Sequence, residues 1–321
     1  MATVLVTGAS GFVGSYVVPA LLADGHRVAA LVRSDAAGQT VLGRLGPDDR
    51  IGIETRIGDV TRPETLPAAL SGVDAVVHLV AIPRDRDGGA TLRLVNTEGT
   101  RNVVEAMKAA GVRRLVHMGA MGVEDDPKLH YASSKAKAEV IVRESGLDWT
   151  VLKPSLQWGE RDGFFNILAG LVRMSPGLVP VPGSGESRFQ PISVMEVARI
   201  AAIALGDDAT IGRSYDLGGP RYWTYREITR EVLRGMGTKR VIVPMPVALI
   251  RLVAGVSETL RIPFPVATDQ LRQLRLDNIT DSLDGVEREF GFRPTDMGGQ
   301  LGYLRRKPRD QDRVAPVAAS A

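Results

Sequence analysis

Apolar, β-branched runs alternate with helix-like segments through the first half of the chain. The runs stand at residues 3–7, 27–32, 51–55, 74–80, 114–119 and 149–154. Such an alternation predicts βαβ units and a parallel sheet. The runs are apolar without a break instead of alternating with polar residues, which favours a sheet covered by helices on both faces. We therefore predict an α/β fold with a doubly wound parallel sheet.

The alternation of strand-like and helix-like segments ends after Pro154, and a segment rich in glycine and proline follows at residues 175–191. A helix-like segment and a strand-like segment then suggest a return to the sheet, and helical patterns follow. We predict two interleaved domains and a flexible tail. The sheet domain comprises residues 1–153 and about 191–219, the smaller and mostly helical lobe comprises 154–190 and about 220–304, and the tail comprises 305–321.

Composition excludes several kinds of site. The 321 residues include no cysteine, which excludes disulfides, thiolate catalysis and cysteine-bound metal. The four histidines lack the paired spacing of metal ligands, so we expect no metal site. The net charge is +3, and the tail contributes five basic and two acidic residues. The remaining residues hold 35 basic and 35 acidic side chains, which argues against a nucleic-acid partner.

The chain shows neither a secretory leader nor a clear membrane span. Its first strand begins at Thr3, so we expect a cytoplasmic protein. The most apolar stretch of the second half, residues 244–265, is interrupted by Arg251, whereas a membrane span needs about 20 uninterrupted apolar residues. We expect a helix packed in the smaller lobe or at a contact in a homo-oligomer. The alternative is an apolar wall for a hydrophobic substrate or a membrane surface.

The N-terminal stretch VLVTGASGFVGSYVVPALL carries a glycine-rich turn between the first strand and the first helix. Gly8 would allow the sharp turn, Gly11 the close approach of backbone to phosphates, and Gly14 the close packing of helix on strand. The helix N-terminus also offers unpaired N–H groups to an anion. The turn therefore predicts a Rossmann-type, dinucleotide-binding sheet domain. The residues expected to bind the pyrophosphate are Gly8, Ser10, Gly11, Phe12, Val13 and Gly14.

The end of the second strand indicates the choice of cofactor. An NAD-specific site places an acidic residue there to accept hydrogen bonds from the ribose, whereas this strand ends in Arg33 and Ser34. A guanidinium group suits the 2′-phosphate of NADP through charge-assisted hydrogen bonds. We therefore predict NADP(H) as the cofactor. NAD(H) remains the alternative, in which Arg33 is a solvated surface residue.

Tyr131 and Lys135 are the candidate catalytic residues, and we also expect both to bind the cofactor, with the Lys135 ammonium on the nicotinamide ribose. They stand four positions apart on a predicted helix and therefore share a face. The Lys135 ammonium would stabilise the Tyr131 phenolate and lower the pKa of the tyrosine. Tyr131 would then exchange a proton with a substrate oxygen while hydride moves to or from a nicotinamide. Ser133 and Ser134 point away by helical phase, and we predict that they lie on the helix surface.

The chain resembles the extended, atypical short-chain dehydrogenases/reductases, which include epimerase/dehydratase-like and NmrA-like proteins. The resemblance rests on TGASGFVGS, GDV at 58–60, VVHLVA at 76–81, NTEGTRNVVEA at 96–106, YASSK at 131–135 and LKPS at 152–155. More narrowly, LKPSLQWGERDGFFN, RFQPISVMEVARIAAIAL and YDLGGPRYWTYREI are similar to the branch that contains the NAD(P)H-binding accessory subunit of respiratory complex I.

This resemblance implies further contacts with the cofactor. It implies that Asp59 and Val60 contact the adenine, and that Leu79, Val80 and Ala81 line the ribose side. Pro154 and Ser155 would contact the nicotinamide. It also implies a serine or threonine just upstream of the Tyr–Lys pair, where this chain has Gly119 and Ala120. Ser155, His130 or a water would have to replace that hydrogen-bond donor.

Two functions follow from these residues. The first is an NAD(P)H-dependent oxidoreductase that acts on a small, apolar carbonyl or alcohol. The second is a nicotinamide-binding protein with little or no turnover, structural or redox-sensing, as the resemblance to the complex I subunit implies. A sugar-nucleotide epimerase ranks third, because those enzymes usually use the missing serine or threonine.

Overall fold

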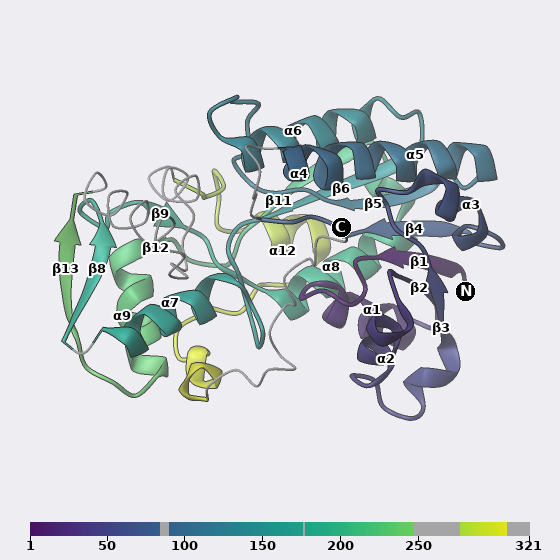
Figure 1. The fold of residues 1–321 in the computed structure, drawn as a ribbon. Coiled ribbons are helices and arrows are strands. Elements are labelled where there is room, and N and C mark those ends of the chain that lie inside the picture. Colours follow the sequence, from purple (N-terminus) through teal and green to yellow (C-terminus); the bar gives the residue numbers. More distant parts are fainter. Residues whose placement is uncertain (84–89, 176, 247–276, 307–321) are drawn as a thin grey trace. The chain divides into compact units, whose positions relative to one another are not determined.

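The computed structural model describes residues 1–83, 90–175, 177–246 and 277–306, and the chain divides into two compact units (Figure 1). The first unit comprises Met1–Pro154 and Val194–Leu217, and the second comprises Ser155–Ser193 and Gly218–Ala321. The boundaries that we predicted, after residues 153, 190 and 219, lie one to three residues from these. The first unit is thus formed by two separate stretches of chain.

A seven-stranded parallel sheet forms the centre of the first unit. The strand order is β3-β2-β1-β4-β5-β6-β11, and all neighbours run parallel. The order reverses between β1 and β4, as in a doubly wound sheet, which confirms the predicted fold class. The strands are β1 (Thr3–Thr7), β2 (Arg27–Val32), β3 (Ile53–Ile57), β4 (Ala75–His78), β5 (Arg114–Met118), β6 (Asp148–Pro154) and β11 (Arg213–Leu217).

Helices cover both faces of this sheet, with α1, α2 and α8 on one face and α5 and α6 on the other (Figure 1). The helices are α1 (Gly14–Ala23), α2 (Asp35–Leu42), α3 (Leu66–Ala69), α4 (Ala90–Leu92), α5 (Gly99–Ala110), α6 (His130–Arg143) and α8 (Val194–Gly206). The short turns are η1 (Asp49–Gly52), η2 (Pro63–Thr65), the π-helical η3 (Arg93–Glu98) and η4 (Asp208–Thr210).

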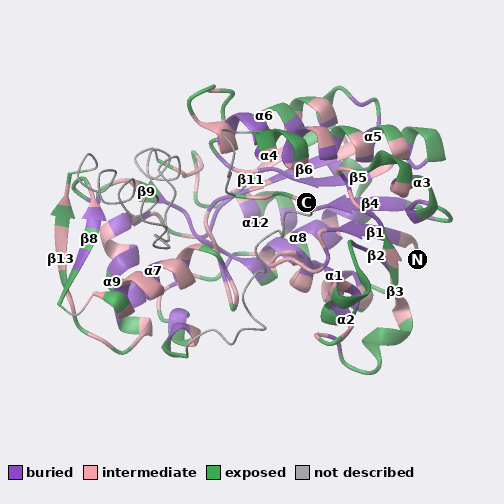
Figure 2. Cartoon of the chain, viewed as in Figure 1, coloured by how far each residue is buried: buried purple, intermediate pink, exposed green. Residues whose placement is uncertain are grey.

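Burial in the first unit follows the apolar pattern of the sequence. Strands β1, β2, β4 and β5 are buried along nearly their whole length (Figure 2). The edge strand β3 has no fully buried residue, which agrees with its sequence, IETRI, where apolar and polar residues are mixed. We predicted this strand at residues 51–55, but Ile51 and Gly52 belong to η1 and the strand extends to Ile57.

The described residues of the second unit form helices and pairs of short strands. The helices are α7 (Phe164–Met174), α9 (Tyr225–Gly235) and α12 (Gly285–Phe290), with the turn η5 (Leu301–Arg305). The strand pairs are β7 (Gln157–Trp158) with β10 (Ile192–Ser193), β9 (Arg188–Phe189) with β12 (Trp223–Thr224), and β8 (Leu178–Pro182) with β13 (Val241–Met245). Helix α9 begins at a capping box between Thr224 and Glu227 and buries Ile228 and Val232 in the core of the unit.

Two segments named in the sequence analysis lie wholly or largely outside the described residues. These are the apolar stretch at 244–265, of which only 244–246 are described, and the tail from residue 307 onward. In the ranges that the structure does describe, no helix combines the length and apolar character needed to cross a membrane.

Candidate functional site

The glycine-rich turn lies between β1 and α1, where the order of the sheet reverses. Gly8 has a φ of +73°, and the Gly11 N–H donates to the Gly8 carbonyl at 2.9 Å. A Cβ on Gly14 would lie 2.3 Å from the Gly8 oxygen and 2.7 Å from Ala9 Cα, so only glycine fits there. A Cβ on Gly11 would meet only the Gly8 oxygen within 4 Å, at 3.1 Å. Gly11 thus faces open space, which fits the close approach of a pyrophosphate.

The polar groups of the turn leave N–H donors at the start of α1. No side chain caps this helix. The Ser15 N–H donates to the Gly11 carbonyl at 3.1 Å and the Tyr16 N–H to the Val13 carbonyl at 3.0 Å, so the N–H groups without a partner among the described residues are those of Phe12, Val13 and Gly14. Two carbonyl oxygens of the turn are held by protein donors: Ser15 Oγ donates to Phe12 at 2.7 Å, and Arg44 Nη1 donates to Ser10 at 2.8 Å. The remaining N–H groups suit an anion.

The segment after β4 packs directly against this turn. The Leu79 N–H donates to the Thr7 carbonyl at 3.2 Å, which continues the sheet by one residue. A Cβ on Gly8 would lie 3.1 Å from Val80 N and 3.2 Å from the Leu79 carbonyl carbon. The structure therefore brings Leu79 and Val80 beside Gly8, and it leaves Ala81 exposed.

Asn96, on the π-helical turn η3, fixes the course of the chain beyond Ala81. Its Oδ1 accepts from the Ile82 N–H at 2.8 Å, and its Nδ2 donates to the Ile82 carbonyl at 3.1 Å and to Ser134 Oγ at 3.0 Å. Asn96 is 1% exposed, so these bonds satisfy a buried amide. This role of Asn96 was not predicted from the sequence. The only signal in the sequence was a polar residue shortly before the amphipathic helix α5.

Arg33 and Ser34 follow β2 at the same edge of the sheet. Arg33 is exposed and makes no hydrogen bond or ion pair with any residue that the structure describes. Ser34 Oγ accepts from the Ala37 N–H at 3.3 Å and caps α2. Arg44, which sequence reasoning did not single out, adds a second guanidinium that is bonded to the glycine-rich turn at Ser10.

Asp59 and Val60 follow β3, next along the same edge. Asp59 Oδ1 accepts from the N–H and the hydroxyl of Thr61, both at 2.8 Å, so this oxygen shapes the local turn. Val60 is buried and packs against Gly99, where an added Cβ would lie 2.9 Å from Val60 Cγ2. These contacts give both residues a structural role in addition to the adenine contact predicted for them.

Tyr131 and Lys135 lie one turn apart on α6. Lys135 is 3% exposed, and its Nζ donates to the carbonyl of Met118, the last residue of β5, at 2.5 Å. Burial lowers the pKa of Lys135 from 10.5 to about 8, against an opposing effect of Glu139. The Tyr131 hydroxyl makes no hydrogen bond with the described part of the chain. The pair thus combines a buried amine with an unengaged phenol.

The pKa of Tyr131 differs from our expectation. We predicted that Lys135 lowers it, but burial raises the pKa of Tyr131 above its usual value of 10. The physical reason lies in the direction of the lysine, whose ammonium is bonded to the Met118 carbonyl. The loss of solvent around the phenol is therefore not offset by a hydrogen bond from Lys135.

Two buried histidines stack on neighbouring strands of the same sheet. The rings of His78 on β4 and His117 on β5 lie 5.3 Å apart at an interplanar angle of 27°. His78 is within 2.7 Å of Thr7 Oγ1 and 3.1 Å of Thr100 Oγ1, whereas neither nitrogen of His117 has a partner among the described residues. Burial first, and the Lys135 charge second, lower the pKa of His78 to about 3 and that of His117 well below its ordinary value. Both rings are neutral near pH 7.

The two positions upstream of the Tyr–Lys pair are not equivalent. A Cβ on Gly119 would lie 2.9 Å from Lys153 Cγ and 3.1 Å from Val151 Cγ1, and Gly119 is buried beside β6. Position 119 therefore has no room for a side chain. Ala120 is only partly buried, which leaves it as the position where a hydroxyl side chain would fit.

Our placement of Ser133 and Ser134 on the helix surface is wrong. They are 7% and 5% exposed. Ser133 Oγ donates to Asp125 Oδ1 at 2.5 Å, and Ser134 Oγ donates to the Tyr131 carbonyl at 2.8 Å and accepts from Asn96. Helical phase alone could not reveal these partners, because Asp125 and Asn96 come from other segments of the chain.

Pro154 and Ser155 belong to different units. Pro154 ends β6, and its carbonyl accepts from the Met121 N–H at 3.2 Å within the first unit. Ser155 is buried in the second unit, where its hydroxyl contacts the Asn278 carbonyl at 2.9 Å and Asn278 Oδ1 at 2.6 Å and accepts from the Gln190 N–H at 3.2 Å. The Ser155 hydroxyl is therefore engaged inside its own unit, which weakens it as the replacement donor. His130, the other residue considered, begins α6.

A metal centre does not emerge from the described side chains. In the four described ranges, no three or more His, Cys, Asp or Glu residues group in a way that could hold a metal ion.

Comparison with known proteins places this geometry in a family. A family model described as NAD(P)H-binding matches residues 8–161. Sterol demethylase protein B of Methylococcus capsulatus is 30% identical over 91% of this chain and 94% of that protein. The photosystem II assembly factor Ycf39 of Guillardia theta is 28% identical over 94% and 93%. The 40 kDa subunit of mitochondrial NADH-ubiquinone oxidoreductase of Neurospora crassa is 24% identical over 92% and 76%.

Solved structures share the fold. The crystal structure of gox2253 is similar with a TM-score of 0.71 and 26% identity, covering 94% of this chain and 96% of that chain. The dTDP-glucose 4,6-dehydratase DesIV from Streptomyces venezuelae, with NAD and TYD bound, has a TM-score of 0.68 and 24% identity over 94% and 95%. With the glycine-rich turn and the reversed strand order, these matches show that the chain belongs to the NAD(P)H-binding family of extended, atypical short-chain dehydrogenases/reductases.

Proposed function

We propose that the protein is an NADP(H)-dependent oxidoreductase that acts on a small, apolar carbonyl or alcohol, with Tyr131 as its proton donor and acceptor. The observation that carries the proposal is the pair on α6: a tyrosine hydroxyl with no partner in the described structure, next to a buried lysine. Tyr131 is only partly buried, so a bound substrate can reach this hydroxyl. A free hydroxyl beside a buried amine suits a reacting oxygen.

The residues of the first unit fit a nicotinamide dinucleotide. Gly11 and the N–H groups at the start of α1 would receive the pyrophosphate, and Leu79 and Val80 would line the ribose side. Arg33 supports NADP over NAD, because it is exposed and has no described partner that competes with a 2′-phosphate. Arg44 adds positive charge at Ser10.

In the proposed reaction the dinucleotide supplies or receives the hydride, and the chain handles the proton. Tyr131 would donate its phenolic proton to the substrate oxygen during reduction and take it back during oxidation. Lys135 would act on Tyr131 electrostatically, and a lysine with a pKa near 8 can exist in either protonation state near neutral pH. An apolar substrate agrees with the name of the sterol-related relative from Methylococcus.

A second candidate function is a nicotinamide-binding protein with little or no turnover. The observation that favours it is the absence of a hydroxyl at Gly119 and Ala120, where the family pattern has a donor for the substrate oxygen. Loss of one such donor typically lowers the rate by about 10²–10³-fold. The relatives named as a photosystem II assembly factor and as a respiratory complex subunit are compatible with this role.

The Tyr131→Phe variant separates the two functions. If Tyr131 transfers the proton, kcat falls by about 10²–10⁴-fold while the dissociation constant of NADPH stays within a factor of two. Turnover is followed as NADPH oxidation with a panel of apolar ketones and aldehydes. Tyr215→Phe on β11 is the matched control and keeps wild-type kcat. A wild type without turnover across the panel, and with NADPH affinity unaffected by Tyr131→Phe, would leave the cofactor-binding protein as the function.

A further inference from the structure

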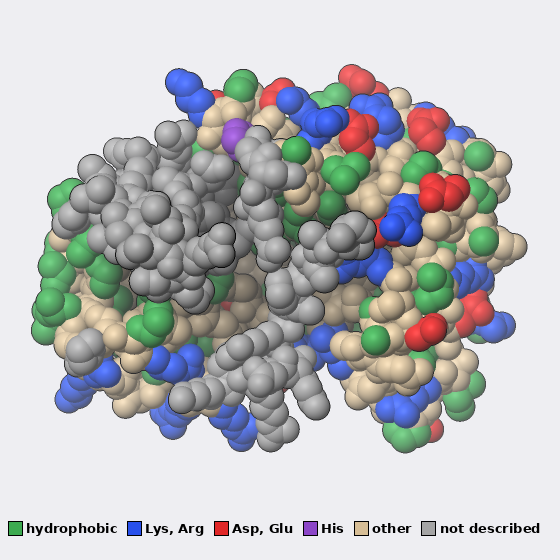
Figure 3. All heavy atoms as spheres, in the orientation of Figure 1, with side chains coloured by type: hydrophobic (Ala, Val, Ile, Leu, Met, Phe, Trp, Pro, Cys, Tyr) green, Lys and Arg blue, Asp and Glu red, His purple; other side chains and the backbone are tan. Residues whose placement is uncertain are grey.

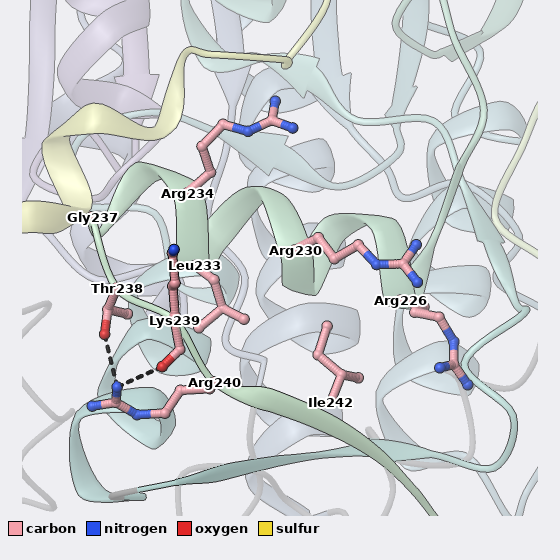
Figure 4. Close-up of a pocket in the computed structure, with 9 residues that line it drawn as sticks. All are labelled: Arg226, Arg230, Leu233, Arg234, Gly237, Thr238, Lys239, Arg240 and Ile242. Atoms are coloured by element: carbon pink, nitrogen blue, oxygen red, sulfur yellow. Dashed lines mark hydrogen bonds between the residues drawn. The ribbon is translucent and has the colours of Figure 1, made fainter.

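A basic concavity lies on the second unit, wholly within its described residues (Figure 4). It encloses about 700 Å³, a volume typical of small-molecule sites. Five of the nine residues that line it are cationic, and none of the nine is acidic. They are Arg226, Arg230, Leu233, Arg234, Gly237, Thr238, Lys239, Arg240 and Ile242. Figure 3 shows Lys and Arg side chains along the lower edge of this unit.

The positive charge follows from the spacing of α9. Arg226, Arg230 and Arg234 stand four residues apart and share one side of the helix, where like charges at this spacing repel each other and reduce stability. The acidic residues of the same helix offset the charge of Arg234 but not that of Arg226 or Arg230. Glu227 is used in the capping box, and Glu231 is 2% exposed and accepts from the Gly299 N–H at 2.7 Å.

The five cationic residues differ in whether they form ion pairs with carboxylates. Arg234 pairs with Glu231 at 2.8 Å, and Arg226 is 3.7 Å from Glu186. Arg230 and Lys239 are exposed, and neither has a carboxylate partner among the described residues. A concavity with unpaired cations and no acidic wall attracts anions.

Side-chain directions narrow the chemical class of the ligand. Figure 4 shows Leu233 and Ile242 between the side chains of Arg226 and Arg230 on one side and Arg240 on the other. Arg240 is held by Thr238 Oγ1 and the Lys239 carbonyl, both at 2.8 Å. The guanidinium groups of Arg226 and Arg230 extend from successive turns of α9, which suits the several oxygens of a phosphate better than a single carboxylate.

We propose that this concavity binds a phosphate-bearing ligand, with the phosphate at Arg226 and Arg230, an organic group against Leu233 and Ile242, and Lys239 adding positive charge on the opposite side, beside Thr238 and Arg240. All lining residues of this concavity belong to the second unit, whereas the glycine-rich turn and the Tyr–Lys pair belong to the first. Two sources present the same chemistry: a free phosphorylated molecule and the headgroup of an anionic lipid.

The test uses the full chain and inorganic pyrophosphate as the probe in isothermal titration calorimetry at low salt. Arg230→Gln combined with Lys239→Gln removes the two unpaired charges, and this variant should fold because it also relieves repulsion along α9. The matched control combines Arg213→Gln with Arg293→Gln, two exposed arginines outside the concavity. We expect pyrophosphate affinity to fall at least tenfold in the pocket variant and to stay within twofold in the control.

A second arm distinguishes the sources. If the wild type cosediments with phosphatidylcholine vesicles that contain phosphatidic acid, and the pocket variant does not, the ligand is a lipid headgroup. If the wild type binds pyrophosphate but not the vesicles, the ligand is a free phosphorylated molecule. The proposal fails if the wild type binds neither probe. It also fails if the pocket variant binds pyrophosphate as tightly as the wild type, since binding then occurs elsewhere, for example at the glycine-rich turn. Binding of polyglutamate but not of pyrophosphate would overturn it in favour of an acidic polypeptide.

Discussion

The two ends of the proposed nicotinamide site, the glycine-rich turn and the Tyr–Lys pair, are built by different means. At the glycine-rich turn the geometry resides in the backbone: Gly8 adopts a positive φ, and Gly14 lies against the Gly8 carbonyl. At the Tyr–Lys end the geometry depends on side chains held by distant segments, such as Lys135 on the Met118 carbonyl. At Gly8 and Gly14 the backbone leaves no room for an added side chain, whereas the side chains of the Tyr–Lys end can be substituted and still fold. Substitution of Gly14 should therefore affect stability, and substitution of Tyr131 should affect chemistry.

The largest effect is expected for Gly14→Ala. The new Cβ would overlap the Gly8 oxygen at 2.3 Å, and overpacking of this kind should lower the free energy of unfolding by about 3 kcal/mol. Gly170→Ala in α7, where a Cβ meets nothing within 4 Å, is the control and should be neutral or stabilising by up to about 1 kcal/mol. Urea unfolding measures both. A Gly14→Ala variant of wild-type stability would show that the turn can relax.

Serine substitutions at the two positions upstream of the Tyr–Lys pair should separate an effect on stability, caused by lack of space, from an effect on kcat. Gly119→Ser should lower the free energy of unfolding by about 1–3 kcal/mol, because its Cβ meets Lys153 and Val151. Ala120→Ser should leave stability unchanged and, if the hydroxyl reaches the substrate oxygen, raise kcat by up to about 10²-fold. Steady-state kinetics with the best ketone substrate measures the gain. Equal kcat for Ala120→Ser and wild type would remove position 120 from the reaction.

Lys135 should give stability a distinctive pH dependence. Its pKa is 10.5 when unperturbed and about 8 in the folded chain, so the unfolded state binds more protons between these values. Stability must then rise with pH in this window, by about 2 kcal/mol from pH 8 to 9.5. Lys135→Met should lack this rise, whereas Lys137→Met, on an exposed position of the same helix, should retain it. Parallel pH slopes for Lys135→Met and wild type would mean that Lys135 is not buried in solution.

The smallest effect is expected at the exposed adenosine end. Arg33→Ala should weaken NADPH binding about tenfold, equivalent to about 1.4 kcal/mol, and leave NADH binding within twofold. The charge is solvated, so a larger loss is not expected. Arg27→Ala at the opposite end of β2 is the control. Fluorescence titration with both cofactors decides the matter: equal losses for NADPH and NADH would exclude Arg33 from the 2′-phosphate contact.

The sheet could be predicted from the sequence because each strand is marked by residues that are close together in the chain. Unbroken apolar runs mark β1, β2, β4, β5 and β6, and glycine spacing marks the first turn. Strand β3 was misplaced by two residues, because an edge strand buries too little for its pattern to be clear.

The side-chain interactions of the site could not be predicted, because they join segments far apart in sequence. Asn96 contacts Ser134 from 38 residues away, and Arg44 contacts Ser10 from 34 residues away. Helical phase placed Ser134 on the surface although these contacts bury it. The same limit explains the wrong direction for the pKa of Tyr131, which depends on where the Lys135 ammonium points.

The discontinuous first unit has a consequence for synthesis on the ribosome. Helix α8 packs against α1, and Arg114 on β5 donates to the carbonyls of Ala204 and Leu205 at the end of α8. Translation at about 5–20 residues per second must therefore pass through residues 155–193 before this layer and β11 exist. Until then the nascent chain carries a sheet with one face partly uncovered and β6 as an open edge, a state prone to aggregation and suited to chaperone binding. A chain that stopped near residue 161, where the family match ends, would remain in that state.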